Sequence, residues 1–122
     1  MQYALLIYAA PGSRGAESRS DEGVFGSWVD YTQAVKSAGA LLAAEQLESV
    51  ETATSVRLRG GERLLTDGPF VETKEHLLGF YLVDVPGLDT AIDWAGRMPH
   101  IGRGTVEVRP LRTGMAWQRL LE

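Results

Sequence analysis

The sequence predicts an α+β domain of the ferredoxin-like, split βαβ type, with a β-hairpin inserted in its middle. Apolar runs and amphipathic stretches follow one another as strand, helix, strand, strand, helix, strand once the hairpin is set aside. The first and third of these strands, which are central in this topology, are apolar at nearly every position. The last strand alternates between apolar and polar residues, as expected at the edge of a sheet.

The first half of the chain predicts a strand, a loop and a helix. Residues 3–8 are all apolar and stop before Pro11-Gly12, which favours a strand buried on both faces. Residues 11–20 are rich in Gly, Ser and Arg and predict a loop. Ser20 or Asp21 could cap the following helix, which Gly39 is placed to end. The apolar residues of this helix recur at helical spacing and are Val24, Trp28, Tyr31, Val35 and Ala38.

The second half predicts the remaining elements. Residues 41–47 form a second strand, and residues 54–59 and 63–66 form a hairpin joined by two glycines at 60 and 61. Residues 80–85 form an apolar strand, and residues 105–109 an alternating one. Between them we expect a helix from residue 88 to about residue 98, with its buried stripe at Leu88, Ala91, Ile92 and Ala95.

Two helices in this topology cover only one face of the sheet. Apolar side chains on the other face then need a cover. A second copy of the same sheet, packed face to face about a two-fold axis, provides it at least cost. We therefore expect a homodimer with a shared core between the two sheets.

Length and composition limit the remaining possibilities. A chain of 122 residues fits one domain, residues 1–122. The absence of cysteine excludes disulfides and thiolate metal sites, and no targeting segment or long apolar span is evident, which favours a cytoplasmic protein that does not enter a membrane. A net charge of −4 argues against a nucleic-acid surface. His76 and His100 lack metal-ligand spacing and no cofactor motif stands out, so we expect no metal and no cofactor. For His100, beyond the second helix, a cationic role or a hydrogen bond at that helix end is a sufficient structural explanation.

The segment from Asp67 to Glu75 is the candidate site. Asp67-Gly68-Pro69 predicts a turn, and charges of both signs follow it, among them Glu72 and Lys74. One interpretation is an acidic chain reversal with a solvated, salt-bridged surface. The other is a loop that places these groups beside a pocket, where the carboxylates could transfer protons.

Three stretches of the chain resemble a known family. The runs "YALLIYA", "LLTDGPFVETKEHLLGFYLVDVPGLDTAIDWA" and "GTVEVRPL" are similar to the YCII-related family, in particular its DGPF branch, from Met1 to about Leu111. The resemblance implies a dimeric α+β barrel and a small enzyme or ligand-binding protein. It also implies a histidine–aspartate pair in a cleft lined by the sheet, but Trp28 and Met98 stand at the two positions here. Genes of this branch often lie near those of extracytoplasmic-function sigma factors, which implies a regulatory context.

Three functional hypotheses follow. The first is a small-molecule-binding protein with a cleft between the sheet and the Asp67–Glu75 loop. Asp67 would orient the ligand, Lys74 would neutralise an anionic group, and Tyr8, Trp28 and Phe70 would form apolar walls. The second is a lyase, isomerase or hydrolase with Asp67 or Glu72 as general base. The third is a protein-binding accessory, linked to sigma-factor regulation, that uses the hairpin Thr54–Thr66.

Overall fold

The computed structural model describes residues 1–10, 22–70, 73–112 and 120–121. A four-stranded sheet has the strand order β2-β5-β1-β6, and a separate two-stranded sheet is made of β3 and β4. Two helices and one 3₁₀ turn, η2, complete the described elements. In chain order the elements are β1 (Gln2–Ala9), α1 (Glu22–Ser37), β2 (Leu41–Gln46), η2 (Val50–Thr52), β3 (Thr54–Arg59), β4 (Glu62–Asp67), β5 (His76–Asp84), α2 (Leu88–Gly96) and β6 (Gly104–Pro110).

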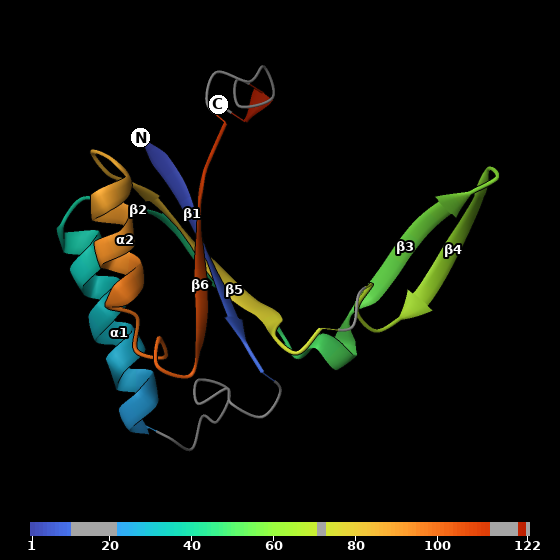
Figure 1. The fold of residues 1–122 in the computed structure, drawn as a ribbon, viewed down its shortest axis with the longest axis horizontal. Coiled ribbons are helices and arrows are strands. Elements are labelled where there is room, and N and C mark those ends of the chain that lie inside the picture. Colours follow the sequence, from blue (N-terminus) through green and yellow to red (C-terminus); the bar gives the residue numbers. More distant parts are fainter. Residues whose placement is uncertain (11–21, 71–72, 113–119, 122) are drawn as a thin grey trace.

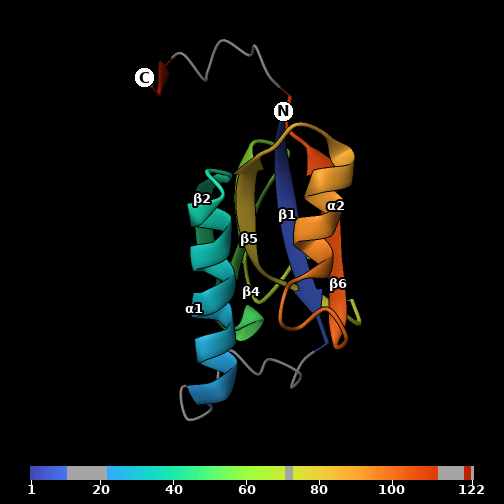
Figure 2. The same cartoon turned by 90° about the vertical axis from the view of Figure 1, so that its left-hand side faces the viewer.

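The main sheet has the arrangement that the sequence predicts. β1 pairs antiparallel with both β5 and β6, and β2 pairs antiparallel with the other side of β5. The two apolar strands are therefore central, and the alternating strand β6 is at an edge. Both helices lie on the same face of the sheet (Figures 1 and 2). The architecture is α+β and compatible with a ferredoxin-like fold.

The core lies between the helices and one face of the central strands. Leu5 and Val83, one from each central strand, are completely shielded from solvent, as is Val35 of α1. Residues of β1 that alternate with this face, such as Leu6 and Tyr8, are only half-buried. In the single chain the first strand is thus fully buried on one face, where the sequence predicts burial on both.

The buried side of α2 differs in part from the predicted stripe. Ala91 and Ala95 are buried as expected, but Leu88 and Ile92 are each 50% exposed. Trp94 takes their place in the core, because the side of α2 that meets the sheet continues from Ala91 at the i+3 and i+4 positions. The Tyr31 hydroxyl donates a hydrogen bond of 2.8 Å to the Trp94 carbonyl and joins the two helices.

Helix α1 ends as the sequence predicts. Gly39 has φ +74°, its N–H donates to the Lys36 carbonyl at 3.0 Å, and the Ala40 N–H donates to the Val35 carbonyl at 3.2 Å. These two bonds form a Schellman motif, which requires the left-handed backbone that glycine adopts most readily. Ala38 lies at this helix end and is exposed. The predicted N-cap residues 20 and 21 lie outside the described residues.

The inserted hairpin is confirmed and stands apart from the main sheet. Gly60 and Gly61 both have positive φ, +59° and +81°, as a tight two-residue turn between antiparallel strands requires. The hairpin projects from the side of the main sheet opposite the helices (Figure 1). We call residues 54–67 the arm.

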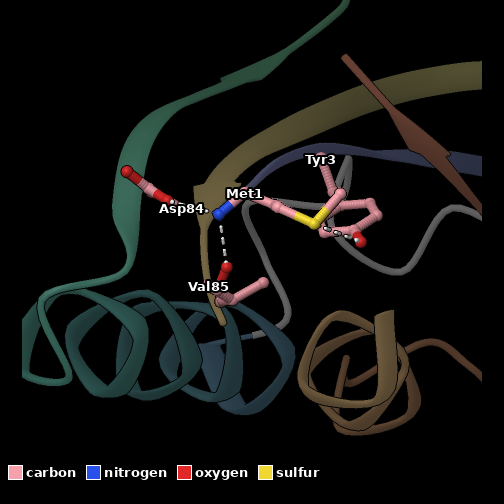
Figure 3. A network of polar contacts seen from close by, with 4 residues as sticks. All are labelled: Met1, Tyr3, Asp84 and Val85. Carbon is pink, nitrogen blue, oxygen red and sulfur yellow. Dashed lines mark hydrogen bonds and ion pairs between the residues drawn. The ribbon is translucent and has the colours of Figure 1, made fainter. Parts of the chain in front are cut away.

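The amino terminus is held against the end of β5 (Figure 3). The Met1 amino group donates to the Val85 carbonyl at 2.7 Å and forms an ion pair of 3.2 Å with the exposed Asp84 carboxylate. The Tyr3 hydroxyl contacts the Met1 sulfur at 3.8 Å. Neither helix in the described part of the chain is long and apolar enough to cross a membrane.

Candidate functional site

A cleft of about 420 Å³ lies where β1 ends and β5 begins. Three parts of the chain form its walls: the end of β1, the segment between β2 and β3, and the segment that joins the arm to β5. The residues that line it are Tyr8, Leu47, Glu48, Ser49, Val50, Thr52, Ala53, Pro69, Thr73, Glu75, His76 and Leu77.

A shift in strand register positions Tyr8 in this cleft. The pairing between β1 and β5 is interrupted between Ile7 and Tyr8, so that Tyr8 lies opposite Leu77. On its other side Tyr8 lies opposite Thr105 of β6. Ile7 is buried beneath the helices and successive side chains of a strand point to opposite faces, so Tyr8 lies on the face without helices. Such irregularities often redirect a side chain at the edge of a site.

Hydrogen bonds fasten the other walls to the sheet and the arm. The Leu47 N–H donates to the Leu78 carbonyl of β5 at 2.8 Å, which ties the start of the β2–β3 segment to the main sheet. The Gly68 N–H donates to the Ala53 carbonyl at 2.7 Å, and the Ser55 hydroxyl donates to the Gly68 carbonyl at 2.9 Å. The turn that contains Gly68 and Pro69 is therefore held against the base of the arm.

The predicted site residues of this segment that the structure describes are not among those that line the cleft. Asp67 is the last residue of β4, opposite Thr54, and its side chain is exposed. Phe70 is 67% exposed, and the Arg57 guanidinium lies 5.2 Å from its ring centre. Lys74 is exposed and is not among the lining residues, and Glu72 lies outside the described residues.

Of the charged groups that line the cleft, Glu75 ends the predicted segment, whereas Glu48 and His76 lie outside that segment. Glu48 and Glu75 contribute carboxylates, and His76 contributes an imidazole. The Thr105 hydroxyl donates to Glu75 Oε1 at 3.3 Å, and the Thr73 hydroxyl donates to the Glu75 carbonyl. Glu75 and His76 are contiguous with the start of a buried strand, which is the signal that could have found them.

Trp28, which the sequence placed in an apolar wall of the same cleft as Tyr8, lies on the other face of the sheet. It belongs to α1, and its ring packs against Tyr31 at 5.9 Å and Tyr81 at 6.2 Å between ring centres. These are core contacts between the helix layer and the sheet. Tyr8 points the other way because it follows Ile7 along the strand, so the two aromatic side chains do not meet in one pocket.

His100 lies in the turn after α2, beside Trp28 of α1. Its ring centre is 5.6 Å from that of Trp28. Both ring nitrogens are shielded from solvent, and the geometry gives neither of them a hydrogen-bond partner at the end of α2 among the described residues. Burial lowers the pKa of His100, and the Tyr8 carbonyl and the Glu75 carboxylate act in the opposite direction.

Among the described residues, no three His, Asp or Glu side chains come together in a way that could hold a metal ion. What the cleft does contain is a phenol, two carboxylates and an imidazole, beside the apolar side chains of Leu47, Val50, Pro69 and Leu77. Such a set can hydrogen-bond a small polar group and bury an apolar one.

Comparison with known proteins identifies the family of this chain. The YCII-related domain matches residues 1–114. An uncharacterised protein of Rhizobium meliloti (strain 1021) is 39% identical over 114 residues, which cover 91% of this chain and 92% of that protein. The extent of both matches shows that the chain belongs to the YCII-related family.

Proposed function

We propose that this member of the YCII-related family binds a small molecule in the cleft between the end of the sheet and the base of the arm. The observation that carries the proposal is the cleft itself, whose volume of about 420 Å³ is in the range of small-molecule sites. Its walls are tied to one another by the hydrogen bonds of Leu47 and Gly68. A preformed site of this kind costs little ordering when a ligand binds.

The charges of the cleft favour a neutral or cationic ligand. Glu48 and Glu75 line it, and His76 is its one described basic side chain. An anionic ligand, which Lys74 was expected to neutralise, would meet two carboxylates instead. We therefore propose a compound with an apolar part and an amine, amide or hydroxyl group that donates to Glu75, with Tyr8 packed against it.

Ligand screening by thermal shift, followed by calorimetry on the hits, tests the proposal. Glu75→Gln should weaken binding of a cationic hit about tenfold or more, because it removes a charge-assisted hydrogen bond. Asp93→Asn, on the exposed side of α2, removes the same charge away from the cleft and should leave affinity unchanged. Equal effects of the two variants, or binding that neither Glu75→Gln nor Tyr8→Phe alters, would place the ligand elsewhere.

An acid–base reaction in the same cleft is a second proposal, favoured by the carboxylates that line it. Asp67 is exposed and outside the lining, whereas Glu75 lines the cleft and is half-buried. If a ligand found in the screen proves to be a substrate, Glu75→Gln should stop its turnover. Asp67→Asn should reduce turnover only if Asp67 is the general base. Turnover that survives Glu75→Gln would contradict the role of Glu75.

We further propose that the protein is a homodimer that covers the face of the sheet opposite the helices. This face presents Leu6, Phe80 and Leu82, which the single chain leaves half-buried. Burying such side chains contributes about 1.5–3 kcal/mol each when it is complete. Light scattering at micromolar concentration tests the proposal, and a stable monomer under those conditions would contradict it.

A further inference from the structure

The arm has one apolar face that its own chain does not cover. Val56 of β3 lies directly opposite Leu65 of β4, and Leu58 is the next residue of β3 on the same face, where Arg63 lies opposite it. The three side chains are 60%, 66% and 73% exposed for Val56, Leu65 and Leu58. Contiguous exposed apolar side chains of this kind mark interaction surfaces.

The opposite face of the arm is different. Arg57 lies across from Leu64 on that face, and its guanidinium reaches the Phe70 ring at 5.2 Å. Leu64 is 39% exposed, less than the three apolar side chains of the other face. The arm thus has one face that contacts Phe70 through Arg57 and another face whose apolar side chains are largely exposed.

The arm in isolation has little to hold its shape. Its two strands pair only with each other, in a sheet of their own. A single two-stranded hairpin is marginally stable at best in water, and a hydrophobic face against a further layer is what normally stabilises it. A partner that covers Val56, Leu58 and Leu65 would supply that layer.

The direction of the arm indicates what this partner is. The arm projects from the side of the main sheet that has no helix, as both views show (Figures 1 and 2). The half-buried side chains Leu6, Phe80 and Leu82 lie on that same side. A molecule seated on the open sheet face therefore lies beside the arm, and the two apolar surfaces can be covered by one partner.

The charge of the arm indicates the same partner. Residues 54–67 carry three arginines, one glutamate and one aspartate, which is a net charge of +1. Since the whole chain carries −4, the rest of it carries −5. A second copy of the chain is therefore an acidic partner for a basic arm, and this difference in sign favours contact between the arm and another subunit's body.

We propose that the arm clasps a second copy of this chain that is seated on the open sheet face. The two-fold symmetry of such a pair makes the contact reciprocal. Each arm therefore buries its apolar face against the body of the other subunit. This inference rests on the homodimer proposed above and adds the arm to its interface. It is independent of any ligand in the cleft.

Neighbouring residues on opposite faces of β4 provide a matched test. Leu65→Asp places a negative charge on the uncovered apolar face, and Thr66→Asp places the same charge on the other face. Both positions are exposed, so neither variant should unfold the chain. In sedimentation velocity, we expect Leu65→Asp to weaken dimerisation about tenfold or more and Thr66→Asp to change it by less than about twofold.

A sheet variant separates the arm from the dimer itself. Leu82→Asp, on the open sheet face, should abolish dimerisation whether or not the arm takes part. A dimer that Leu82→Asp disrupts and Leu65→Asp leaves intact would overturn the role of the arm and keep the sheet interface. A wild-type chain that stays monomeric would overturn both, and calorimetric titration of the cleft would still test ligand binding by itself.

Hydrogen exchange gives a second readout that needs no variant. Amides of residues 56–59 and 62–65 should exchange more slowly at concentrations where the protein is dimeric than after dilution to monomer. Because the chain has no cysteine, Leu58→Cys can also carry a single spin label without competing sites. Arm amides that exchange at the same rate in both states, together with a label as mobile in the dimer as in the monomer, would show that no subunit covers the arm.

Discussion

The side-chain hydroxyls of Thr32 on α1 and Tyr81 on β5 lie 2.5 Å apart. Thr32 Oγ1 also donates a bond of 2.7 Å to the Trp28 carbonyl one turn earlier in the helix. A threonine hydroxyl has only one proton to donate, so the Tyr81 hydroxyl is the donor in the shared bond. Burial raises the pKa of Tyr81, and the Thr32 hydroxyl acts in the opposite direction. This bond joins the helix layer to a central strand beside the packed rings of Trp28 and Tyr31.

Removing the Thr32 hydroxyl should lower the free energy of unfolding more than removing the Tyr81 hydroxyl. Thr32→Val leaves the Tyr81 hydroxyl without its partner, and we expect a loss of about 1–3 kcal/mol in the free energy of unfolding. Tyr81→Phe leaves Thr32 bonded to the Trp28 carbonyl, so the loss should be about 0.5–1.5 kcal/mol. Urea denaturation of both variants and of the double variant measures this. Strictly additive losses in the double variant would contradict a direct bond between the two side chains.

Gly104 should be one of the least replaceable glycines. A Cβ built on it would be forced against the Tyr8 carbonyl of the neighbouring strand, a backbone atom that cannot move aside easily. Gly104→Ala should therefore push β6 away from β1 and lower stability by about 1–3 kcal/mol. Gly102→Ala is the control, since a Cβ there has no neighbour within 4 Å. Similar thermal unfolding temperatures for the two variants would contradict this close approach of the strands.

The stability of variants at Gly39 should depend only on how readily the new residue adopts a positive φ. A Cβ at this residue would have no neighbour within 4 Å, but the φ of +74° is disfavoured for residues with a side chain. Gly39→Ala should cost about 1 kcal/mol, Gly39→Asn less, and Gly39→Val more, because asparagine adopts the left-handed region more readily than β-branched residues do. Chemical denaturation ranks the three. A valine variant as stable as the asparagine variant would argue against the Schellman geometry.

His100 should make stability depend on pH. Burial lowers the pKa of His100 below its ordinary value of 6.5, so the unfolded chain takes up the proton more readily than the folded one. Stability is then greatest above pH 6.5 and falls as the pH decreases from there toward the lowered pKa. His100→Gln should flatten this part of the profile, and His76→Gln serves as the comparison. Unfolding curves between pH 5 and 8 that are parallel for wild type and His100→Gln would contradict the effect.

The order and central position of the strands could be predicted because their signals are local. Leu5 and Val83 lie in apolar runs that only the middle of a sheet can accommodate, and both are fully buried. Gly39, Gly60 and Gly61 mark chain reversals wherever the rest of the fold lies, and each has the expected positive φ. The prediction of the buried residues of α2 is less accurate. Leu88 and Ile92 fit the helical period, but the orientation of the short helix on the sheet buries Trp94 instead.

The sequence by itself determined the family pattern and the succession of elements, and it directed attention to the Asp67-Gly68-Pro69 turn, of which Pro69 lines the cleft. Only the tertiary structure decided which side chains share a cleft. Tyr8 faces it through an irregular pairing with β5, Trp28 is held in the core on the other face, and Asp67 remains exposed. Those outcomes depend on strand register and on the direction of the arm, which arise from contacts between residues far apart in the chain and leave no periodic signal in the sequence.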